Sequence, residues 1–274
     1  MNQVELQYGS ATDVGEVREV NEDSFLASPP IFVVADGMGG HDGGDVASSI
    51  VVEEFGRLTD ARHDPRVGAE VLAATLRECQ RRIAEYGEQQ VSGGKHEWYA
   101  GTTVVAALLV ADEDEGPQWL LANLGDSRVY RFTDDVLEQV SVDHSLVQQM
   151  VDAGSITAAD AAVHPERHVI TKALGGPEEA EADYFLLPLA AVERLVLVSD
   201  GVNGMIDDDA IAAVLRGAED PRDAADRLVA AAVAAGGKDN ATAVVIDVVG
   251  WADARSHDSE RQRETLELKL GTLP

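Results

Sequence analysis

With 274 residues, 45% of them hydrophobic, the chain is long enough to bury a sizeable core in one large domain or two small ones. Its 50 acidic and 21 basic residues give a net charge of −29, a field that repels phosphate backbones and argues against direct nucleic-acid binding. One cysteine, Cys79, excludes an intramolecular disulfide and a cysteine-rich zinc site, and the lack of a long apolar run or a signal-peptide pattern predicts a cytoplasmic protein without a membrane span.

The N-terminal part of the chain combines an apolar strand with amphipathic helices. The apolar run IFVVA stops at Asp36-Gly37 and a glycine-rich turn follows, which predicts a buried strand that ends at the acid. Apolar residues three and four positions apart predict the helices that come next. The expected elements are a turn-rich lead-in within residues 1–30, the start of a strand at 24–27, a strand at 31–35, helices at 45–58 and 67–86, and a loop at 87–99.

The rest of the chain has runs of strands separated by groups of helices. Apolar and β-branched residues in the middle predict consecutive short strands, joined through Gly125-Asp126 as an antiparallel meander. Because strands and helices come in separate runs, the pattern favours an α+β layered domain over alternating βαβ units. The expected elements are strands at 101–110, 119–124, 127–132, 182–187, 194–199 and 241–249, and helices at 145–153, 157–162, 207–215 and 222–235.

Acidic residues stand at the ends of the most apolar strands. One follows IFVVA, one follows LVLVS, one precedes ATAVVIDVV, and one lies between two middle strands. If these strands are neighbours, their carboxylates gather at one edge and repel one another unless cations neutralise them. The acids concerned are Asp36, Asp200, Asp239 and Asp126, with the pair Glu22-Asp23 upstream.

The donor atoms of these side chains indicate which cations could bind. Oxygen ligands, without a cysteine cluster or an HExxH pair, favour hard ions such as Mg²⁺ or Mn²⁺. A shared Asp36 could hold two ions about 4 Å apart that activate a water, and Gly37 could offer its carbonyl. Arg18 lies four residues before Glu22 and could grip a phosphate with its guanidinium. Two cations, an arginine and a water nucleophile together suggest phosphomonoester hydrolysis.

Short motifs in a particular order resemble the metal-dependent protein phosphatases, the PPM or type-2C serine/threonine phosphatases, in their bacterial form. Each motif is weak alone, and their common order over residues 5–250 carries the resemblance. The motifs are RxxNED at 18–23, ADGMGGH at 35–41, GTT at 101–103, GDSR at 125–128, DHS at 143–145, ITKALGG at 170–176, SDG at 199–201 and KDNAT at 238–242.

The resemblance implies an αββα sandwich, with two packed antiparallel β-sheets flanked by helices and metals at one end. It implies a phosphatase domain at 1–250, with a flap at 143–170, and a polar tail at 251–274. The implied activity is hydrolysis of phosphoserine and phosphothreonine in proteins by water activated by two Mn²⁺ or Mg²⁺ ions. The implied partners are phosphorylated proteins and a serine/threonine kinase whose action is reversed, and the protein is expected to be a monomer that binds no nucleic acid.

The resemblance assigns metal-binding roles residue by residue. Asp36 would bridge the two ions, and Gly37 would give its carbonyl to one of them. Asp200 and Asp239 would ligate the other, and Asp36 and Asp239 count among the catalytic residues. Asp126 matches a ligand of a weaker third ion.

Further roles concern the substrate and the surroundings of the ions. Arg18 would bind the phosphate and is the third expected catalytic residue. Glu22 and Asp23 would act through metal-bound waters. The flap residues His144 and His164 are expected to be structural or to face solvent.

Two positions depart from the family pattern. Met38 stands where many members carry a histidine, so water would deliver the proton to the leaving group. Gly204 stands where many members carry an aspartate near the third ion, so that ion is expected to be weak or absent. Two alternatives remain: a degenerate, non-catalytic phosphoprotein-binding module, which Gly204 favours, and a narrow switch-protein phosphatase in a sigma-factor partner cascade.

Overall fold

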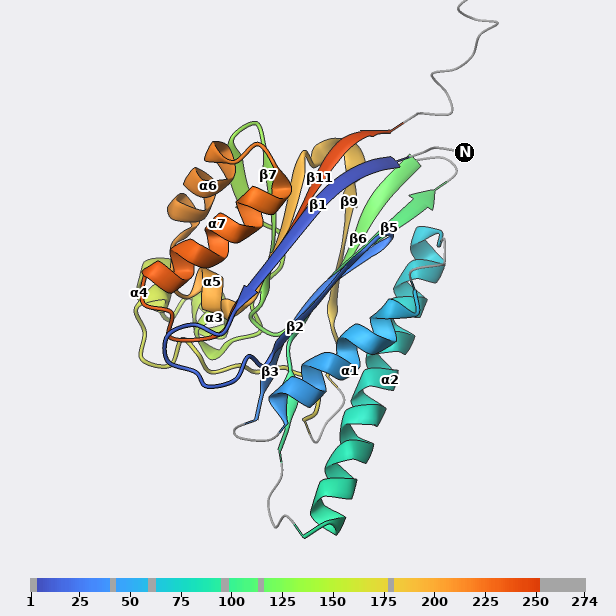
Figure 1. Cartoon of the computed structure of the whole chain (residues 1–274), viewed down its shortest axis with the longest axis vertical. Coiled ribbons are helices and arrows are strands. Elements are labelled where there is room, and N and C mark those ends of the chain that lie inside the picture. The colour runs from blue at the N-terminus through green and yellow to red at the C-terminus, as the bar shows by residue number, and fades with distance from the viewer. Residues whose placement is uncertain are drawn as a thin grey trace, which may run out of the picture.

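The fold is a sandwich of two antiparallel sheets with helices on both outer faces, shown by the computed structural model in Figure 1. Helices α1 (Gly44–Gly56) and α2 (Pro65–Ser92) cover one sheet, and α6 (Asp208–Gly217) and α7 (Pro221–Ala234) cover the other. This arrangement confirms the predicted αββα sandwich. The structure describes residues 4–39, 43–58, 63–94, 99–112, 116–176 and 180–251.

The described strands form two sheets with non-sequential strand orders. In the first, the order is β1-β11-β10-β7-β8, and in the second it is β2-β3-β5-β6-β9, with β4 paired to β3. The strands are β1 (Val4–Asp13), β2 (Asp23–Ser28), β3 (Ile31–Met38), β4 (Gly101–Thr102), β5 (Val104–Asp112), β6 (Gly116–Leu124), β7 (Arg128–Thr133), β8 (Val136–Gln139), β9 (Asp183–Pro188), β10 (Arg194–Val198) and β11 (Ala241–Trp251).

Strand β3 is apolar throughout its first half because both of its faces are buried. Phe32 faces the other sheet, where its ring packs edge-on against Tyr8 of β1, with 5.4 Å between centroids. Trp119 on β6 of its own sheet packs edge-on against the same ring, at 5.9 Å. Ile31 and Val33 face the helices α1 and α2 instead. A strand covered on both faces shows a continuous apolar run rather than alternation, which is the pattern that predicted it.

The structure corrects where this strand ends. We expected the strand at 31–35 to stop before Asp36, but β3 continues to Met38. It continues because Gly37 and Met38 pair with Thr102 and Gly101 of β4. Asp36 therefore lies within a strand, where its backbone is fixed by neighbours on both sides.

The predicted meander is also wrong in one connection. Strands β5 and β6 form a hairpin in one sheet, whereas β7 pairs with β10 in the other. Gly125-Asp126 thus connects the two sheets rather than neighbouring strands of one sheet. Local apolar patterns mark strands but not their partners, so this crossover was not predicted.

Five further segments differ from expectation. The turn-rich lead-in contains the ten-residue strand β1, and α2 continues to Ser92, through part of the expected loop at 87–99. Strand β8 and the short helices α5 (Asp200–Asn203) and η1 (Leu189–Ala191) were not predicted. The expected helices in the flap are present as α3 (Leu146–Asp152) and α4 (Ala158–Ala162). Most of the expected tail lies outside the described residues.

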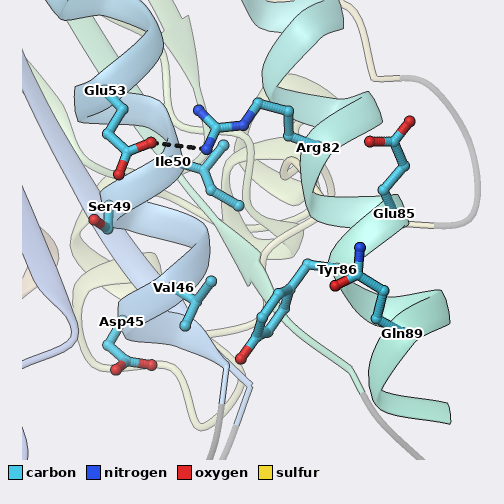
Figure 2. A pocket seen from close by; sticks show the side chains of 9 residues that line it. All are labelled: Asp45, Val46, Ser49, Ile50, Glu53, Arg82, Glu85, Tyr86 and Gln89. Carbon is cyan, nitrogen blue, oxygen red and sulfur yellow. Dashed lines mark hydrogen bonds and ion pairs between the residues drawn. The ribbon is translucent and has the colours of Figure 1, made fainter. Parts of the chain in front are cut away.

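A surface groove separates α1 from α2 and is shown in Figure 2. An ion pair crosses it, with 2.7 Å between Arg82 Nη2 and Glu53 Oε2. Among the described residues, no helix is long and apolar enough to span a bilayer.

Arg194 is a buried cation that joins helix α6 to its sheet. It lies on β10 and bonds both carboxylate oxygens of Asp247 on β11, at 2.6 and 2.8 Å. Its Nη1 also donates to the carbonyls of Leu215 and Ala218, at 2.9 Å each. These carbonyls end α6, so one guanidinium satisfies acceptors at the C-terminus of a helix and fixes that helix on the sheet.

We expect Arg194→Lys to lower the free energy of unfolding by about 1–3 kcal/mol, because lysine cannot reproduce the forked hydrogen bonds and leaves buried acceptors unpaired. Urea denaturation measures the change. The matched control is Arg131→Lys, which alters the more exposed Arg131–Glu138 pair and should change stability by less than about 1 kcal/mol. Equal effects of the two substitutions would contradict the role of Arg194.

Candidate active site

Two carboxylates face each other across neighbouring strands. Asp23 on β2 is directly opposite Asp36 on β3 in the antiparallel register. Like charges at such positions repel, and both side chains are partly buried. The pair is therefore unfavourable on its own and indicates a site built to receive positive charge.

Tight backbone contacts bring Asp126 to this pair. Gly125 has a φ of +119°, and a Cβ there would lie 2.6 Å from the Cβ of Thr103. Thr103 in turn accepts a hydrogen bond from the Asp36 N–H at 3.1 Å and donates its own N–H to the Asp36 carbonyl at 2.9 Å. Only glycine allows the crossover to lie this close, so Asp126 is held next to the backbone of Asp36.

A second close approach brings Asp200 and Asp239 together. Asp200 begins α5 two positions after the end of β10, and Asp239 lies two positions before the start of β11. A Cβ on Gly201 would lie 1.8 Å from the carbonyl oxygen of Asn240. The glycine of the Asp-Gly pair therefore lets the start of α5 pack against the start of β11.

Gly37 has the same function at the end of β3. A Cβ there would lie 2.2 Å from the Gly44 carbonyl oxygen and 2.5 Å from that of Glu22. The Gly37 N–H also donates to the Glu22 carbonyl at 3.2 Å. Glu22, the end of β3 and the start of α1 are thus in direct contact. Residues 40–42 of the glycine-rich turn, including His41, lie outside the described residues.

Asn240 was missed by sequence reasoning although it lies within KDNAT. It is 5% exposed, and its Oδ1 accepts the Glu22 N–H at 2.8 Å. Its Nδ2 donates to the carbonyls of Val14 and Val20, at 3.0 Å each. A buried asparagine next to a proposed ligand therefore fastens the loop that carries Arg18.

Ser199 is the other residue that was missed. It is fully buried, and its hydroxyl donates to Asp23 Oδ2 at 2.7 Å while accepting the Thr242 N–H at 2.9 Å. It holds Asp23 in place from the neighbouring sheet. The serine of the SDG motif thus orients an acid that lies 176 positions earlier in the chain.

The pKa values of the clustered acids are shifted upward by burial first and by mutual repulsion second. Burial raises the pKa of Asp36 well above its usual range, and Asp23 and Asp200 raise it further. The same causes raise the pKa of Asp126 to about 8 and that of Asp23 to about 7. Burial and then Asp239 raise the pKa of Asp200. The charges of Asp23, Asp200, Asp126 and Asp239 all raise the pKa of Asp36, so these acids lie near enough to interact.

The donor set fits divalent cations. In the described part of the chain, Asp23 Oδ1 and Asp126 Oδ1 are buried without a hydrogen-bond partner, which is costly unless a cation or water satisfies them. No three acidic, histidine or cysteine side chains of the described residues converge tightly enough to enclose an ion alone. Backbone carbonyls and water would therefore complete the ligand sets, as is usual for Mg²⁺.

Arg18 is the cation placed at the edge of the cluster. Its Nη2 lies 2.7 Å from Asp239 Oδ2, and its side chain is 49% exposed. The hydrogen bond to Asp239 raises the pKa of the guanidinium, which stays charged. Its other N–H groups can therefore still donate to an anionic substrate that approaches from solvent.

His144 holds the Asp126 loop from the flap side. Its Nδ1 accepts the backbone N–H of Gly125 at 3.1 Å, and the backbone N–H of His144 donates to the Gly125 carbonyl at 2.9 Å. Nε2 lies 3.1 Å from Asp183 Oδ2 and is therefore the nitrogen that carries the hydrogen. Burial lowers the pKa of this imidazole. These contacts are those of a structural residue, as expected.

The structure thus gathers at one end of the sandwich the acids that the sequence selected, with Arg18 beside them. Their contacts and mutual effects on pKa place them together, whereas the role of each toward an ion stays a prediction. The residues in the cluster are Arg18, Glu22, Asp23, Asp36, Asp126, Asp200 and Asp239.

Comparison with known sequences finds bacterial serine/threonine phosphatases among the relatives of this chain. A family model described as protein phosphatase 2C matches residues 16–235. The serine/threonine phosphatase stp of Listeria innocua is 34% identical over 247 residues, which is 86% of this chain and 93% of that protein. The serine/threonine protein phosphatase PstP of Mycobacterium tuberculosis is 37% identical over 251 residues, which is 90% of this chain and 46% of that protein.

Solved structures agree with this. The crystal structure of the M. tuberculosis serine/threonine phosphatase PstP/Ppp superposes with a TM-score of 0.78 at 35% identity, covering 89% of this chain and 98% of that one. The crystal structure of the catalytic domain of PstP in complex with two manganese ions superposes with a TM-score of 0.77 at 33% identity. The superposition covers 89% of this chain and 99% of that one. At these identities the likeness extends beyond the fold.

We expect Mn²⁺ to raise the melting temperature of the metal-free protein by roughly 5–10 °C at about 100 times its dissociation constant. Asp36→Asn should lose most of this increase. A raised pKa in the folded state means that this acid favours folding at low pH and opposes it as the pH rises through that pKa. The metal-free variant should therefore be at least as stable as the metal-free wild type, and more so at pH 8 than at pH 5.

Scanning calorimetry with and without chelator measures these shifts. The exposed helix residue Asp226 provides the control Asp226→Asn, which should keep the full response to Mn²⁺. An unchanged response in Asp36→Asn would show that Asp36 does not bind the cation.

Proposed function

The chain belongs to the protein phosphatase 2C family, and on that premise we propose that it is a metal-dependent serine/threonine protein phosphatase. The observation that carries this proposal is the gathering of buried acids from both sheets around Asp36, with Arg18 at the edge. Its substrates are phosphoserine and phosphothreonine in proteins, and we propose that it reverses a serine/threonine kinase and acts as a monomer.

Individual residues have distinct tasks in this proposal. Asp36, the Gly37 carbonyl, Asp200 and Asp239 hold two Mn²⁺ or Mg²⁺ ions. When bound, these ions supply an activated water and stabilise the charge that develops on the phosphoryl group. Arg18 orients the phosphate by donating hydrogen bonds to its oxygens.

Other residues position this set. Glu22 and Asp23 accept hydrogen bonds from water that surrounds the ions, and Ser199 fixes the Asp23 carboxylate. Met38 has a thioether and cannot donate a proton, so solvent protonates the leaving serine or threonine oxygen. The side chain of Asn240 keeps the Arg18 loop in register with this end of the sandwich.

We expect the purified chain with Mn²⁺ to hydrolyse p-nitrophenyl phosphate and a phosphothreonine peptide. Asp36→Asn and Asp239→Asn should each lower kcat by about 10²-fold or more, because each weakens the binding of cations that stabilise the negative charge of the transition state. Arg18→Ala should lower kcat and also raise KM, because the substrate phosphate no longer accepts hydrogen bonds from the Arg18 guanidinium. Phosphate release measures all three, and Asp226→Asn serves as the unaffected control. Full activity in excess chelator would overturn the mechanism.

The same preparation separates the alternatives. Calorimetry that shows tight phosphopeptide binding without turnover, at saturating Mn²⁺, would support a non-catalytic binding module. Turnover confined to a single protein substrate would support the narrow switch-protein phosphatase.

We further propose that a third ion is weak or absent. Gly204, which ends α5, offers no carboxylate beside Asp126. The nearby aspartates are already engaged: Asp207 caps α6 by accepting the Ala210 N–H at 2.9 Å, and Asp208 accepts the Tyr130 hydroxyl at 2.9 Å.

Titration with Mn²⁺ should therefore fill two sites and leave a third unsaturated at millimolar concentration. Paramagnetic resonance of free Mn²⁺ counts the bound ions. A crystal grown in millimolar Mn²⁺ with a fully occupied third ion on Asp126 would contradict this expectation.

A further inference from the structure

A cavity of about 570 Å³ opens beside the acid cluster, on the flap side. Helices α3 and α4 supply one wall, and the segment from α5 to the start of α6 supplies the other. Asp126 and Asp200 line the cavity and also belong to the cluster. A group in this cavity would therefore lie next to a phosphate held at the proposed active site.

Two acceptor oxygens in the wall of this cavity are unpaired. Asp126 is 6% exposed, and its Oδ1 is buried without a hydrogen-bond partner. Asn203 Oδ1 on α5 is also buried and unpaired, and Asn203 lines the same cavity. Both atoms are acceptors, so a cation or a hydrogen-bond donor would satisfy them. Because we propose that the third ion at Asp126 is weak or absent, a donor from the substrate can take this place.

The charged residues that line the cavity also favour a positively charged group as its occupant. Arg128 is engaged by Asp143, whose two oxygens lie 2.9 and 2.7 Å from its Nε and Nη2, and Arg167 is the other arginine of the wall. His168 approaches Asp200 at 3.9 Å. The aspartates of the wall outnumber these arginines; they are Asp126, Asp143, Asp200, Asp207, Asp208 and Asp209.

A donor with positive charge meets both requirements, and a lysine ammonium or an arginine guanidinium is such a group. We propose that this cavity accepts a lysine or arginine side chain of the phosphoprotein, next to the phosphorylated residue, so that the enzyme selects basic phosphorylation sites. The inference rests on the proposed phosphatase function, because it places the phosphate at Arg18 and the metal ligands.

The charge of the whole chain makes such selection useful. A phosphorylated residue is anionic and approaches a protein with a net charge of −29. A basic neighbour in the substrate offsets this repulsion during approach and pairs with the cavity once bound. A substrate with acidic neighbours meets repulsion at both stages.

Two phosphothreonine peptides test the inference. They share one sequence except that the residues flanking phosphothreonine are arginine in one and glutamine in the other. At about 0.15 M salt, where the long-range field is screened beyond about 8 Å, we expect kcat/KM to favour the arginine peptide by about 10-fold. p-Nitrophenyl phosphate is the reference substrate without flanking side chains.

A charge variant locates the source of the preference. Asp207→Asn, Asp208→Asn and Asp209→Asn combined remove three charges from the wall, while asparagine can still cap α6 and accept the Tyr130 hydroxyl. The preference should fall to about 2-fold. The matched control combines Asp220→Asn, Asp223→Asn and Asp226→Asn, which removes the same charge at the start of α7, outside the cavity lining, and should keep the preference.

The possible outcomes distinguish failure of the inference about the cavity from failure of the proposed phosphatase function. Loss of the preference in the wall variant alone supports the inference. Equal kcat/KM for both peptides, with normal turnover of p-nitrophenyl phosphate, overturns the inference and leaves the proposed function intact. A preference that falls equally in both variants assigns it to the overall charge and overturns the role of the cavity. Failure to turn over any substrate overturns the proposed function and the inference together.

Discussion

The repulsion between Asp23 and Asp36 across adjacent strands is the constraint around which the rest of this end of the molecule is arranged. Two partly buried carboxylates in register would separate if the backbone were free to move. The backbone is not free, because Thr103 holds both the N–H and the carbonyl of Asp36, and Ser199 holds Asp23 from the other sheet. Folding energy from the sandwich therefore maintains an unfavourable charge arrangement that cations can relieve.

Glycine accompanies these acids for a packing reason. Gly37, Gly125 and Gly201 each adjoin an acid of the cluster, and at each a Cβ would meet atoms of a distant segment at 2.6 Å or less. The glycines allow separate loops to approach, and that approach brings the neighbouring carboxylates together. Each of these pairs of glycine and aspartate is thus a point of contact between segments.

The sequence predicted the fold class and the members of the cluster, because runs of strands, runs of helices and acids beside apolar strands are local patterns. It did not predict that β3 continues through Asp36, since that depends on pairing with β4, which lies more than sixty residues later. The crossover at Gly125-Asp126 and the bonds of Asn240 were missed for the same reason. The crossover and these hydrogen bonds both depend on partner residues that are remote in sequence. Local propensity does not identify such partners.

The position of β11 has a consequence for the protein during its synthesis. This last described strand lies between β1 and β10 and has Asp239 and Asn240 directly before it. A chain emerging from the ribosome can form the hairpin of β5 and β6 early, but β1 has no neighbour in its sheet until β11 arrives. The loop that carries Arg18 also lacks its hydrogen bonds to Asn240 until that residue has been made. Nascent chains therefore carry no assembled site, and the activity begins only when almost the entire described chain has been made.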